Sequence, residues 1–268
     1  MENKVILSVY EKALEGMNIE TVFDIVNLYG NKDIDGIELN SNNLETIKKC
    51  ATLCKKNRLL FRCHFPLIKL TESEIIKYLN GVSNIAKELR YDINIVVHTL
   101  ADEDSMIDNI TQSQKYFEKI LAYVEKYKLH VIISAENLNF IGGIRRINVK
   151  EIDEILKIND NLKFTYDIGH DLYDNKIPSV LSSLQKERIN NVHIHSVIKN
   201  EDHHVIQENS KDLDEIMKAI KQLKDIGYTG PIVLEYAIKY LEGKRTEEKV
   251  INFVKSFHFF KNRVLKSV

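Results

Sequence analysis

Imidazole and carboxylate side chains recur along this chain at the ends of short apolar runs. Seven of the nine histidines stand in such positions. The groups concerned are, in chain order, Glu38, His64, His98, Glu136, Asp167, His170, His193, His195, Asp202, His203, His204 and Glu235. Gathered without partners in one partly buried place, these groups would be costly to desolvate. A divalent metal ion is the usual way of satisfying such a set, so the residue types predict a metal centre.

Taken singly, each of these residues has a simpler interpretation. A lone histidine near a strand end is commonly a hydrogen-bonded structural residue, and an acid there can cap the next helix or occupy a turn. The metal prediction therefore depends on whether the elements of the fold bring all of these side chains to one place.

Eight apolar runs rich in β-branched residues alternate with amphipathic stretches of helical period. The predicted strands are Val5–Tyr10, Gly36–Asn40, Leu59–Phe65, Asn94–Thr99, His130–Asn137, Leu162–Asp167, Asn191–Val197 and Pro231–Tyr236. The predicted helices lie near residues 18–29, 43–57, 73–90, 110–127, 150–158, 178–187, 211–226 and 244–262. Thr71 and Ser73 are typical of a helix start, and Pro178 suits a first helical residue.

Runs such as Ile95–Val97 are continuously apolar, which favours parallel strands buried on both faces. Eight strand–helix units within about 250 residues predict an α/β fold, a single (β/α)8 TIM barrel that spans residues 1–268 as one domain. An open doubly wound sheet is the alternative, but no G-x-G-x-x-G turn follows the first strand. Active sites of TIM barrels form at the C-terminal ends of the strands, where the polar groups above fall. His130 opens a strand and His258 lies in the last helix, so neither is assigned to the site.

The overall charge and the cysteine content exclude several classes of protein. The chain has 38 basic and 39 acidic residues, a net charge of -1, which argues against a generally basic nucleic-acid binder. No apolar run approaches a membrane span of roughly 18 residues, and the N-terminus lacks the pattern of a signal peptide. Cys50, Cys54 and Cys63 form no disulfide framework and are interpreted as packing residues. We therefore expect a cytoplasmic protein with no membrane partner.

The order of these motifs resembles the xylose-isomerase-like TIM barrels, a superfamily of sugar and sugar-phosphate isomerases and epimerases that also includes endonuclease IV. The resemblance runs from Gly36-Ile37-Glu38-Leu39 to Val233-Leu234-Glu235. Its most specific part is the ordered set His, His, Glu, Asp-x-x-His, His, Asp-x-His and Glu on successive strand ends.

The two branches of the superfamily imply different metal centres. In the isomerase and epimerase branch, the resemblance implies one divalent ion, Mn²⁺, Co²⁺ or Mg²⁺. Its ligands would be Glu136, Asp167, His193 and Glu235, with Glu136 and Glu235 as the catalytic acid–base pair. In the endonuclease IV branch, it implies three zinc ions. These would be held by His64, His98, Glu136, Asp167, His170, His193, Asp202, His204 and Glu235.

The chain departs from the family pattern after His193. The family usually has Asp or Asn two residues later, whereas this chain has His195, which shares a strand face with His193 and is a candidate for contact with metal or substrate. The Asp-x-His motif fits Asp202 and His204, and a rival register pairs Glu201 with His203. We adopt Asp202 and His204, because the residue types match without substitution.

Three further side chains are candidates for substrate binding, although a structural or solvent-exposed role is also open for each. Glu38 is placed to bind a sugar hydroxyl, and Arg145 and Lys199 to hold a phosphate or carboxylate. The leading functional hypothesis is a metal-dependent isomerase or epimerase of a small sugar or sugar phosphate. The alternative is a zinc phosphodiesterase acting on abasic DNA or a smaller phosphoester, the one hypothesis with a nucleic-acid partner. A non-catalytic metal or ligand binder is a third reading.

Overall fold

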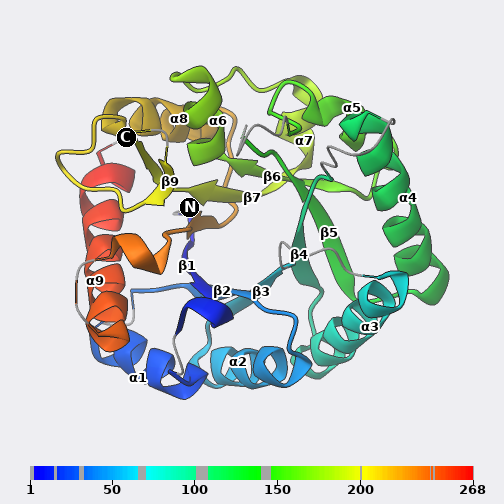
Figure 1. Cartoon of the computed structure of the whole chain (residues 1–268), viewed down its shortest axis with the longest axis horizontal. Coiled ribbons are helices and arrows are strands. Elements are labelled where there is room, and N and C mark those ends of the chain that lie inside the picture. Colours follow the sequence, from blue (N-terminus) through cyan, green and yellow to red (C-terminus); the bar gives the residue numbers. More distant parts are fainter. Residues whose placement is uncertain are drawn as a thin grey trace.

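The computed structural model describes residues 3–14, 17–29, 33–65, 71–100, 108–139, 146–199, 201–241, 243 and 245–267. Its parallel strands close into an eight-stranded barrel, which confirms the predicted α/β TIM barrel (Figure 1). The barrel strands are β1 (Val5–Tyr10), β2 (Gly36–Asn40), β3 (Leu60–His64), β4 (Ile93–His98), β5 (Val131–Glu136), β6 (Lys163–Asp167), β7 (Ile189–Ile194) and β10 (Ile232–Leu234). Neighbouring strands follow chain order, and β10 pairs with β1 to close the ring.

Helices surround the barrel on its outside (Figure 1). They are α1 (Ile19–Tyr29), α2 (Leu44–Asn57), α3 (Glu72–Leu89), α4 (Asn109–Tyr127), α5 (Ile152–Leu156), α6 (Ile168–Asn175), α7 (Ser183–Arg188), α8 (Leu213–Asp225) and α9 (Thr246–Phe259). Short helical turns cover Glu11–Leu14 and Ile238–Tyr240, and a π-helical segment, Phe260–Leu265, extends α9. Within the described part of the chain, no helix is long and apolar enough to cross a membrane.

Local side-chain hydrogen bonds explain where the helices begin. Thr71 caps α3 as predicted, in a reciprocal capping box with Glu74. The prediction that Pro178 is the first residue of a helix is wrong. The helix in that region, α7, starts five residues later, because the Ser182 hydroxyl accepts the Gln185 N–H and the Gln185 side chain bonds back to Ser182.

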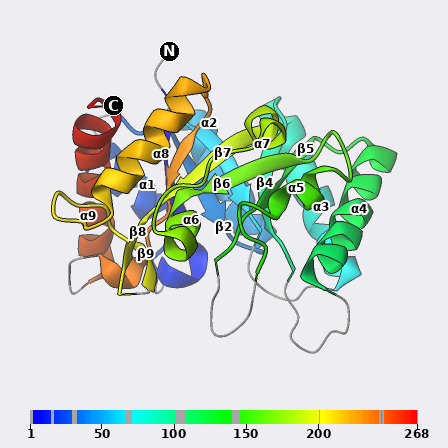
Figure 2. The same cartoon turned by 90° about the horizontal axis from the view of Figure 1, so that it is seen from above.

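Two elements near the barrel mouth were not predicted. Helix α6 starts directly after β6, because the Asp167 carboxylate accepts the N–H of His170 at 2.8 Å and caps the helix. The predicted strand Asn191–Val197 is divided: β7 ends at Ile194, and β8 (Ser196–Ile198) turns back against β9 (Glu201–His204) as an antiparallel hairpin. Figure 2 shows this hairpin beside α6, on the side of the barrel away from the N-terminus.

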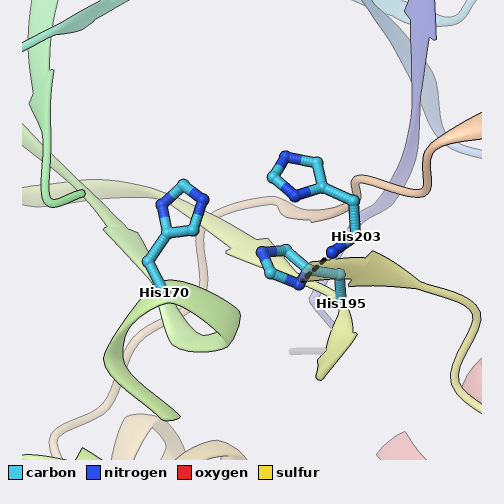
Figure 3. A group of neighbouring side chains, drawn as sticks. All are labelled: His170, His195 and His203. Carbon is cyan, nitrogen blue, oxygen red and sulfur yellow. Dashed lines mark hydrogen bonds between the residues drawn. The ribbon is translucent and has the colours of Figure 1, made fainter. Parts of the chain in front are cut away.

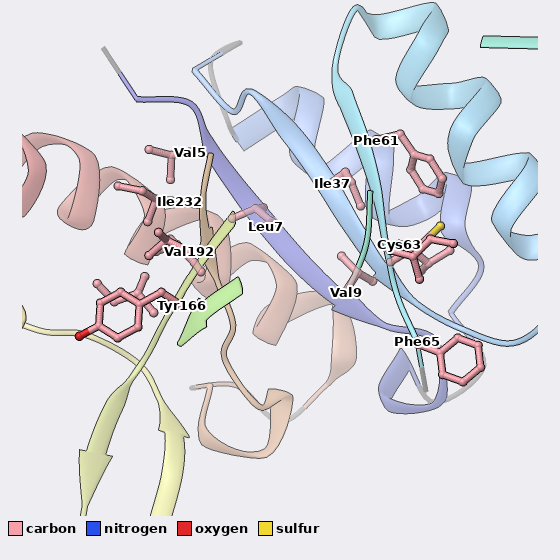
Figure 4. Packing of buried hydrophobic residues seen from close by; sticks show 14 of the residues in the cluster. Val5, Leu7, Val9, Ile37, Phe61, Cys63, Phe65, Tyr166, Val192 and Ile232 are labelled. Carbon is pink, nitrogen blue, oxygen red and sulfur yellow. The ribbon is translucent and has the colours of Figure 1, made fainter. Parts of the chain in front are cut away.

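Alternate residues of each barrel strand lie in two different environments, one between the barrel and its helices and one inside the barrel. One set, including Val5, Leu7 and Val9 of β1, belongs to the buried apolar cluster between the barrel and its helices (Figure 4). Cys50, Cys54 and Cys63 are fully buried in the same cluster, in agreement with their predicted packing role. Because strand side chains alternate in direction, the other set points into the barrel. That set is largely polar, and it supplies the functional groups.

Candidate functional site

The C-terminal ends of the strands bring the predicted acids and histidines together. Glu136, Asp167 and His193 are the interior-facing residues at or next to the ends of β5, β6 and β7, and Glu235 directly follows β10. All four side chains are almost wholly buried. The potential ligand atoms of His64, Glu136, His193 and Glu235 lie within 4.8 Å of one another. We call His64, Glu136, His193 and Glu235 the central cluster.

Two glutamates flank the His193 ring within the central cluster. Nδ1 of His193 lies 2.7 Å from Glu136 Oε1 and 2.7 Å from Glu235 Oε2. Oδ2 of Asp167 is 3.9 Å from the same nitrogen. Three carboxylates and one imidazole nitrogen therefore face one small volume, which is the donor set expected for a divalent cation.

Two histidines, His64 of β3 and His98 of β4, approach the same oxygen of Glu136. Nε2 of His98 lies 3.0 Å from Glu136 Oε2, and Nε2 of His64 lies 3.4 Å from the same oxygen. The His98 side chain keeps 17% of its surface exposed, whereas His64 has none. Glu136 thus faces His64 and His98 with one oxygen and His193 with the other.

A second group of histidines adjoins Asp167 on the side of the hairpin. Figure 3 shows His170 of α6 beside His195 and His203, and ligand atoms of the three rings lie within 4.8 Å of one another. Asp167 joins this group to the central cluster, with Oδ2 3.4 Å from His170 Nδ1 and Oδ1 3.3 Å from His195 Nε2. Asp202 also reaches it, 3.8 Å from His170 Nε2 and 3.4 Å from His203 Nδ1.

The hydrogen bonds of His195 indicate its role. The His203 backbone N–H donates to Nδ1 of His195 at 2.9 Å, drawn as the dashed line in Figure 3. A neutral imidazole whose Nδ1 accepts a bond carries its proton on Nε2, the nitrogen that faces Asp167. In this arrangement His195 orients the Asp167 carboxylate rather than offering a lone pair to a metal ion.

The structure brings together a pair of hairpin residues that belongs to neither of the two registers, Asp202 and His203. His204, predicted as a metal ligand, stacks on the Tyr240 ring at 3.6 Å and lies 3.5 Å from Glu201. His203 joins the histidine group in its place. Regular alternation would turn Asp202 and His204 to one face, but the backbone of His203 is left-handed, with φ of 60°, and breaks that alternation. Asp202 and His203 consequently both approach His170.

The structure places the three predicted substrate-binding side chains in different surroundings. Glu38 is fully buried below the mouth, with Oε1 2.9 Å from His193 Nε2 and Oε2 accepting a bond from Asn191, so it does not face a substrate hydroxyl. Lys199 is exposed at the turn of the hairpin. Arg145 lies outside the described residues.

Two residues with evident roles at the site were missed by sequence reasoning. The Tyr10 hydroxyl, at the end of β1, donates to Glu235 Oε1. Asn137 donates from its side chain to the Asp167 carbonyl at 2.9 Å and accepts the Asp167 N–H at 2.8 Å, which holds the end of β6 in place. The sequence feature that could have identified Tyr10 and Asn137 is their position, because each is a polar residue at or just after the end of a predicted strand.

Electrostatic coupling dominates the central cluster. Burial alone would lower the pKa of His193, but the carboxylates of Glu38, Glu235 and Glu136 outweigh burial and raise it well above the ordinary value. Burial is likewise outweighed at His64, whose pKa rises to about 9 beside Glu136 and Glu235. Burial would raise the pKa of Glu136 and Glu235, yet the neighbouring His193 holds both well below their usual range. Protons on the histidines thus compensate the acids in the metal-free protein.

The donor atoms left over fit a divalent metal ion. Several buried side-chain atoms at the mouth form no hydrogen bond of good geometry with the described residues, although some lie close to a group of opposite charge. They are Nε2 of His64, Oε2 of Glu136, Oδ2 of Asp167, Nε2 of His170, Nδ1 of His203 and Oε2 of Glu235. Unpartnered buried polar atoms are rare and destabilising in folded proteins. A cation bound among them would satisfy several at once.

Comparison with known families agrees with this geometry. Residues 23–257 match the family model described as xylose isomerase-like TIM barrel. The chain belongs to this family. No curated protein matches the sequence.

Solved structures of the same fold include several sugar epimerases. A D-tagatose 3-epimerase-like protein superposes with a TM-score of 0.67 at 20% identity, over 97% of this chain and 99% of that one. D-psicose 3-epimerase from Clostridium cellulolyticum H10 has a TM-score of 0.67 at 14% identity, over 97% and 99%. 3-Keto-D-glucoside 4-epimerase from E. coli has a TM-score of 0.67 at 15% identity, over the whole of both chains. At these identities the likeness establishes the fold alone.

Proposed function

We propose that this protein is a divalent-metal-dependent isomerase or epimerase of a small sugar or sugar phosphate. The observation that carries the proposal is the pair of glutamates, Glu136 and Glu235, each with an oxygen 2.7 Å from Nδ1 of His193. Two carboxylates that flank one ligand position are what proton removal and return at a sugar carbon require. Membership of the family and the epimerase activity named for the structural neighbours support the same reaction class.

The metal ion would be held by Glu136, Asp167, His193 and Glu235, and when bound it would supply Lewis-acid polarisation of the sugar oxygens. Glu136 or Glu235 takes the proton from the carbon next to the carbonyl, and the C–H electron pair moves into an enediolate. For epimerisation the opposite glutamate must be protonated in the substrate complex, and it gives its proton to the other face of that carbon. For isomerisation the proton taken is returned to the neighbouring carbon, and the hydroxyl proton moves between the two oxygens of the enediolate. Tyr10 orients Glu235 through its hydroxyl donor.

Solvent deuterium tests this reaction directly. Protein loaded with Mn²⁺, Co²⁺ or Mg²⁺ is incubated in D2O with D-tagatose, D-psicose, D-fructose and their phosphates, and NMR follows both the sugar products and the deuterium they carry. The expected result is a new epimer or isomer with deuterium at the reacting carbon. Glu136→Gln and Glu235→Gln should each lower the rate by about 10²–10⁴-fold, the usual contribution of a general acid or base. Absence of exchange in every sugar with every metal refutes the proposal.

A zinc phosphodiesterase is the second candidate, and one specific observation favours it. Beyond the central cluster, the ring nitrogens of His98, His170 and His203 and the carboxylate of Asp202 offer enough donors for more than one ion. Elemental analysis of protein purified without chelator separates the two hypotheses. About one ion per chain supports the epimerase. Two or three zinc ions, with cleavage of an oligonucleotide containing an abasic site, support the phosphodiesterase.

Two other expectations stay predictions. A cytoplasmic location rests on the three unpaired, buried cysteines. The organisation of residues 1–268 as one domain rests on the eight-unit pattern of strands and helices. Cell fractionation and limited proteolysis test these two expectations.

A further inference from the structure

We propose that Glu38 is a positioning residue that orients His193 toward the metal, and that Asn191 holds Glu38 for this task. The inference rests on the metal-binding part of the proposed function and does not depend on which sugar reacts. It replaces the substrate contact expected for Glu38, because the buried carboxylate lies behind the His193 ring and not at the open mouth.

The contact spans the interior of the barrel. Glu38 lies on β2 and His193 on β7, and the strands β1 and β10 separate these two in the ring. Oε1 of Glu38 is 2.9 Å from Nε2 of His193, and the Asn191 side chain donates to Oε2 at 3.0 Å. The side chains of Glu38, Asn191 and His193 are 0% exposed, so water does not compete for these contacts.

The chemistry of imidazole explains what the contact achieves. A neutral ring has one N–H and one nitrogen lone pair, and a metal ion needs the lone pair. An ionised carboxylate only accepts hydrogen bonds, so Glu38, 2.9 Å from Nε2, favours the proton on that nitrogen. The Asn191 amide nitrogen also lies 3.1 Å from Nε2. Two N–H groups cannot bond to each other, so in this tautomer Asn191 donates only to Glu38. The lone pair is then on Nδ1, which faces Glu136 and Glu235. A carboxylate behind a metal-binding histidine also increases the basicity of the ring as a ligand.

Asn191 and Arg62 account for the stability of a buried carboxylate at this position. Asn191 satisfies one carboxylate oxygen, and Arg62 lies next to Glu38 in the register of β2 and β3. The Oδ1 atom of Asn191 has no hydrogen-bond partner among the residues described. A flip of this amide would therefore let it accept a bond from a glutamine at position 38, which makes Glu38→Gln a structurally conservative test.

The first experiment measures the tautomer in the unaltered chain. Histidine labelled with ¹⁵N is incorporated, Zn²⁺ is bound, and NMR assigns the protonated and the metal-bound nitrogen of His193. The expected result is Nε2–H with zinc on Nδ1. Zinc on Nε2, with the proton on Nδ1, overturns the inference without any mutation.

The second experiment measures Zn²⁺ affinity by competition with a chromophoric chelator. Glu38→Ala should raise Kd by about 10–100-fold, the usual effect of losing such a partner. Glu38→Gln should raise Kd less, because the glutamine amide oxygen still accepts a hydrogen bond from Nε2–H of His193. In this variant the His193 ring should keep its proton on Nε2. Asn94→Ala is the control: Asn94 is also a buried interior residue, and its Oδ1 accepts a bond from Asn190, away from His193. Its Kd should stay within about twofold of the parent.

The outcomes separate this inference from the proposed function. Equal Zn²⁺ affinity in Glu38→Ala and Asn94→Ala overturns the inference. If Glu38→Ala fails to fold, Glu38→Gln decides: a Zn²⁺ affinity equal to that of Asn94→Ala overturns the inference. If the parent protein binds Zn²⁺ through His193 Nδ1 but converts no sugar when loaded with Mn²⁺, Co²⁺ or Mg²⁺, the proposed function alone is refuted.

Discussion

Replacing Gly169 with alanine should disrupt the candidate site through a single added methyl group. Gly169 is the second residue of α6, and a Cβ built on it would lie 2.2 Å from Cε1, 2.3 Å from Nδ1 and 2.4 Å from Nε2 of His195. These separations are at least 1 Å shorter than ordinary van der Waals contact. The His195 ring is fully buried, so it moves only by giving up its contact with Asp167 and its bond from the His203 N–H.

The size of the effect follows from opposing contributions. Overpacking a buried site costs about 1–3 kcal/mol, while replacing glycine by alanine inside a helix contributes about 0.5–1 kcal/mol in the favourable direction. Gly169→Ala alone should therefore destabilise the protein by up to about 2.5 kcal/mol. In a His195→Ala background the ring is absent, and the same change should stabilise by about 0.5–1 kcal/mol. The coupling free energy between the two positions is then about 1–3 kcal/mol.

Urea unfolding of the parent, the two single variants and the double variant measures this coupling. Zn²⁺ titration of the same four proteins reports the site, and Gly169→Ala should weaken binding because the displaced ring no longer orients Asp167. Additivity of the two substitutions within about 0.5 kcal/mol refutes the reasoning, because residues that do not contact each other behave additively.

Three other predictions concern single groups at the mouth. Because the pKa of His64 is raised from 6.5 to about 9, its contribution to stability is complete below pH 6.5 and is lost as the pH rises through 9. Urea unfolding in chelator should thus show the metal-free protein weakening between these values, and an unchanged or rising stability contradicts the assignment. Tyr10→Phe removes the donor to Glu235 and should lower kcat by about 10–150-fold, the equivalent of a hydrogen bond to a charged group, with the circular dichroism spectrum unchanged. In the multinuclear centre of the second candidate function, His203→Ala should reduce the metal bound per chain, whereas the neighbouring His204→Ala should not. Elemental analysis of the two variants tests this, and the reverse order would restore His204 as the ligand.

The barrel and the approximate location of the site were accessible from the sequence. Continuous apolar runs such as Ile95–Val97 identify strands buried on both faces, because local patterning reflects burial. Once eight parallel strands are assumed to close, every strand end meets at one mouth. The convergence of Glu136, Asp167, His193 and Glu235 follows from that rule without any distance being known.

The tertiary structure alone decided which side chain does what within that mouth. The sequence spacing permitted either His203 or His204, and a left-handed backbone at His203 selected the first. From the sequence, Glu38 was one acid among several near strand ends, and only closure of the barrel placed it behind His193, three strands away around the ring. Residue type and periodicity are local properties, so they predict elements and the order of functional groups. Which partner each histidine ring nitrogen faces depends on distances across the barrel, and these distances are set only when the chain folds.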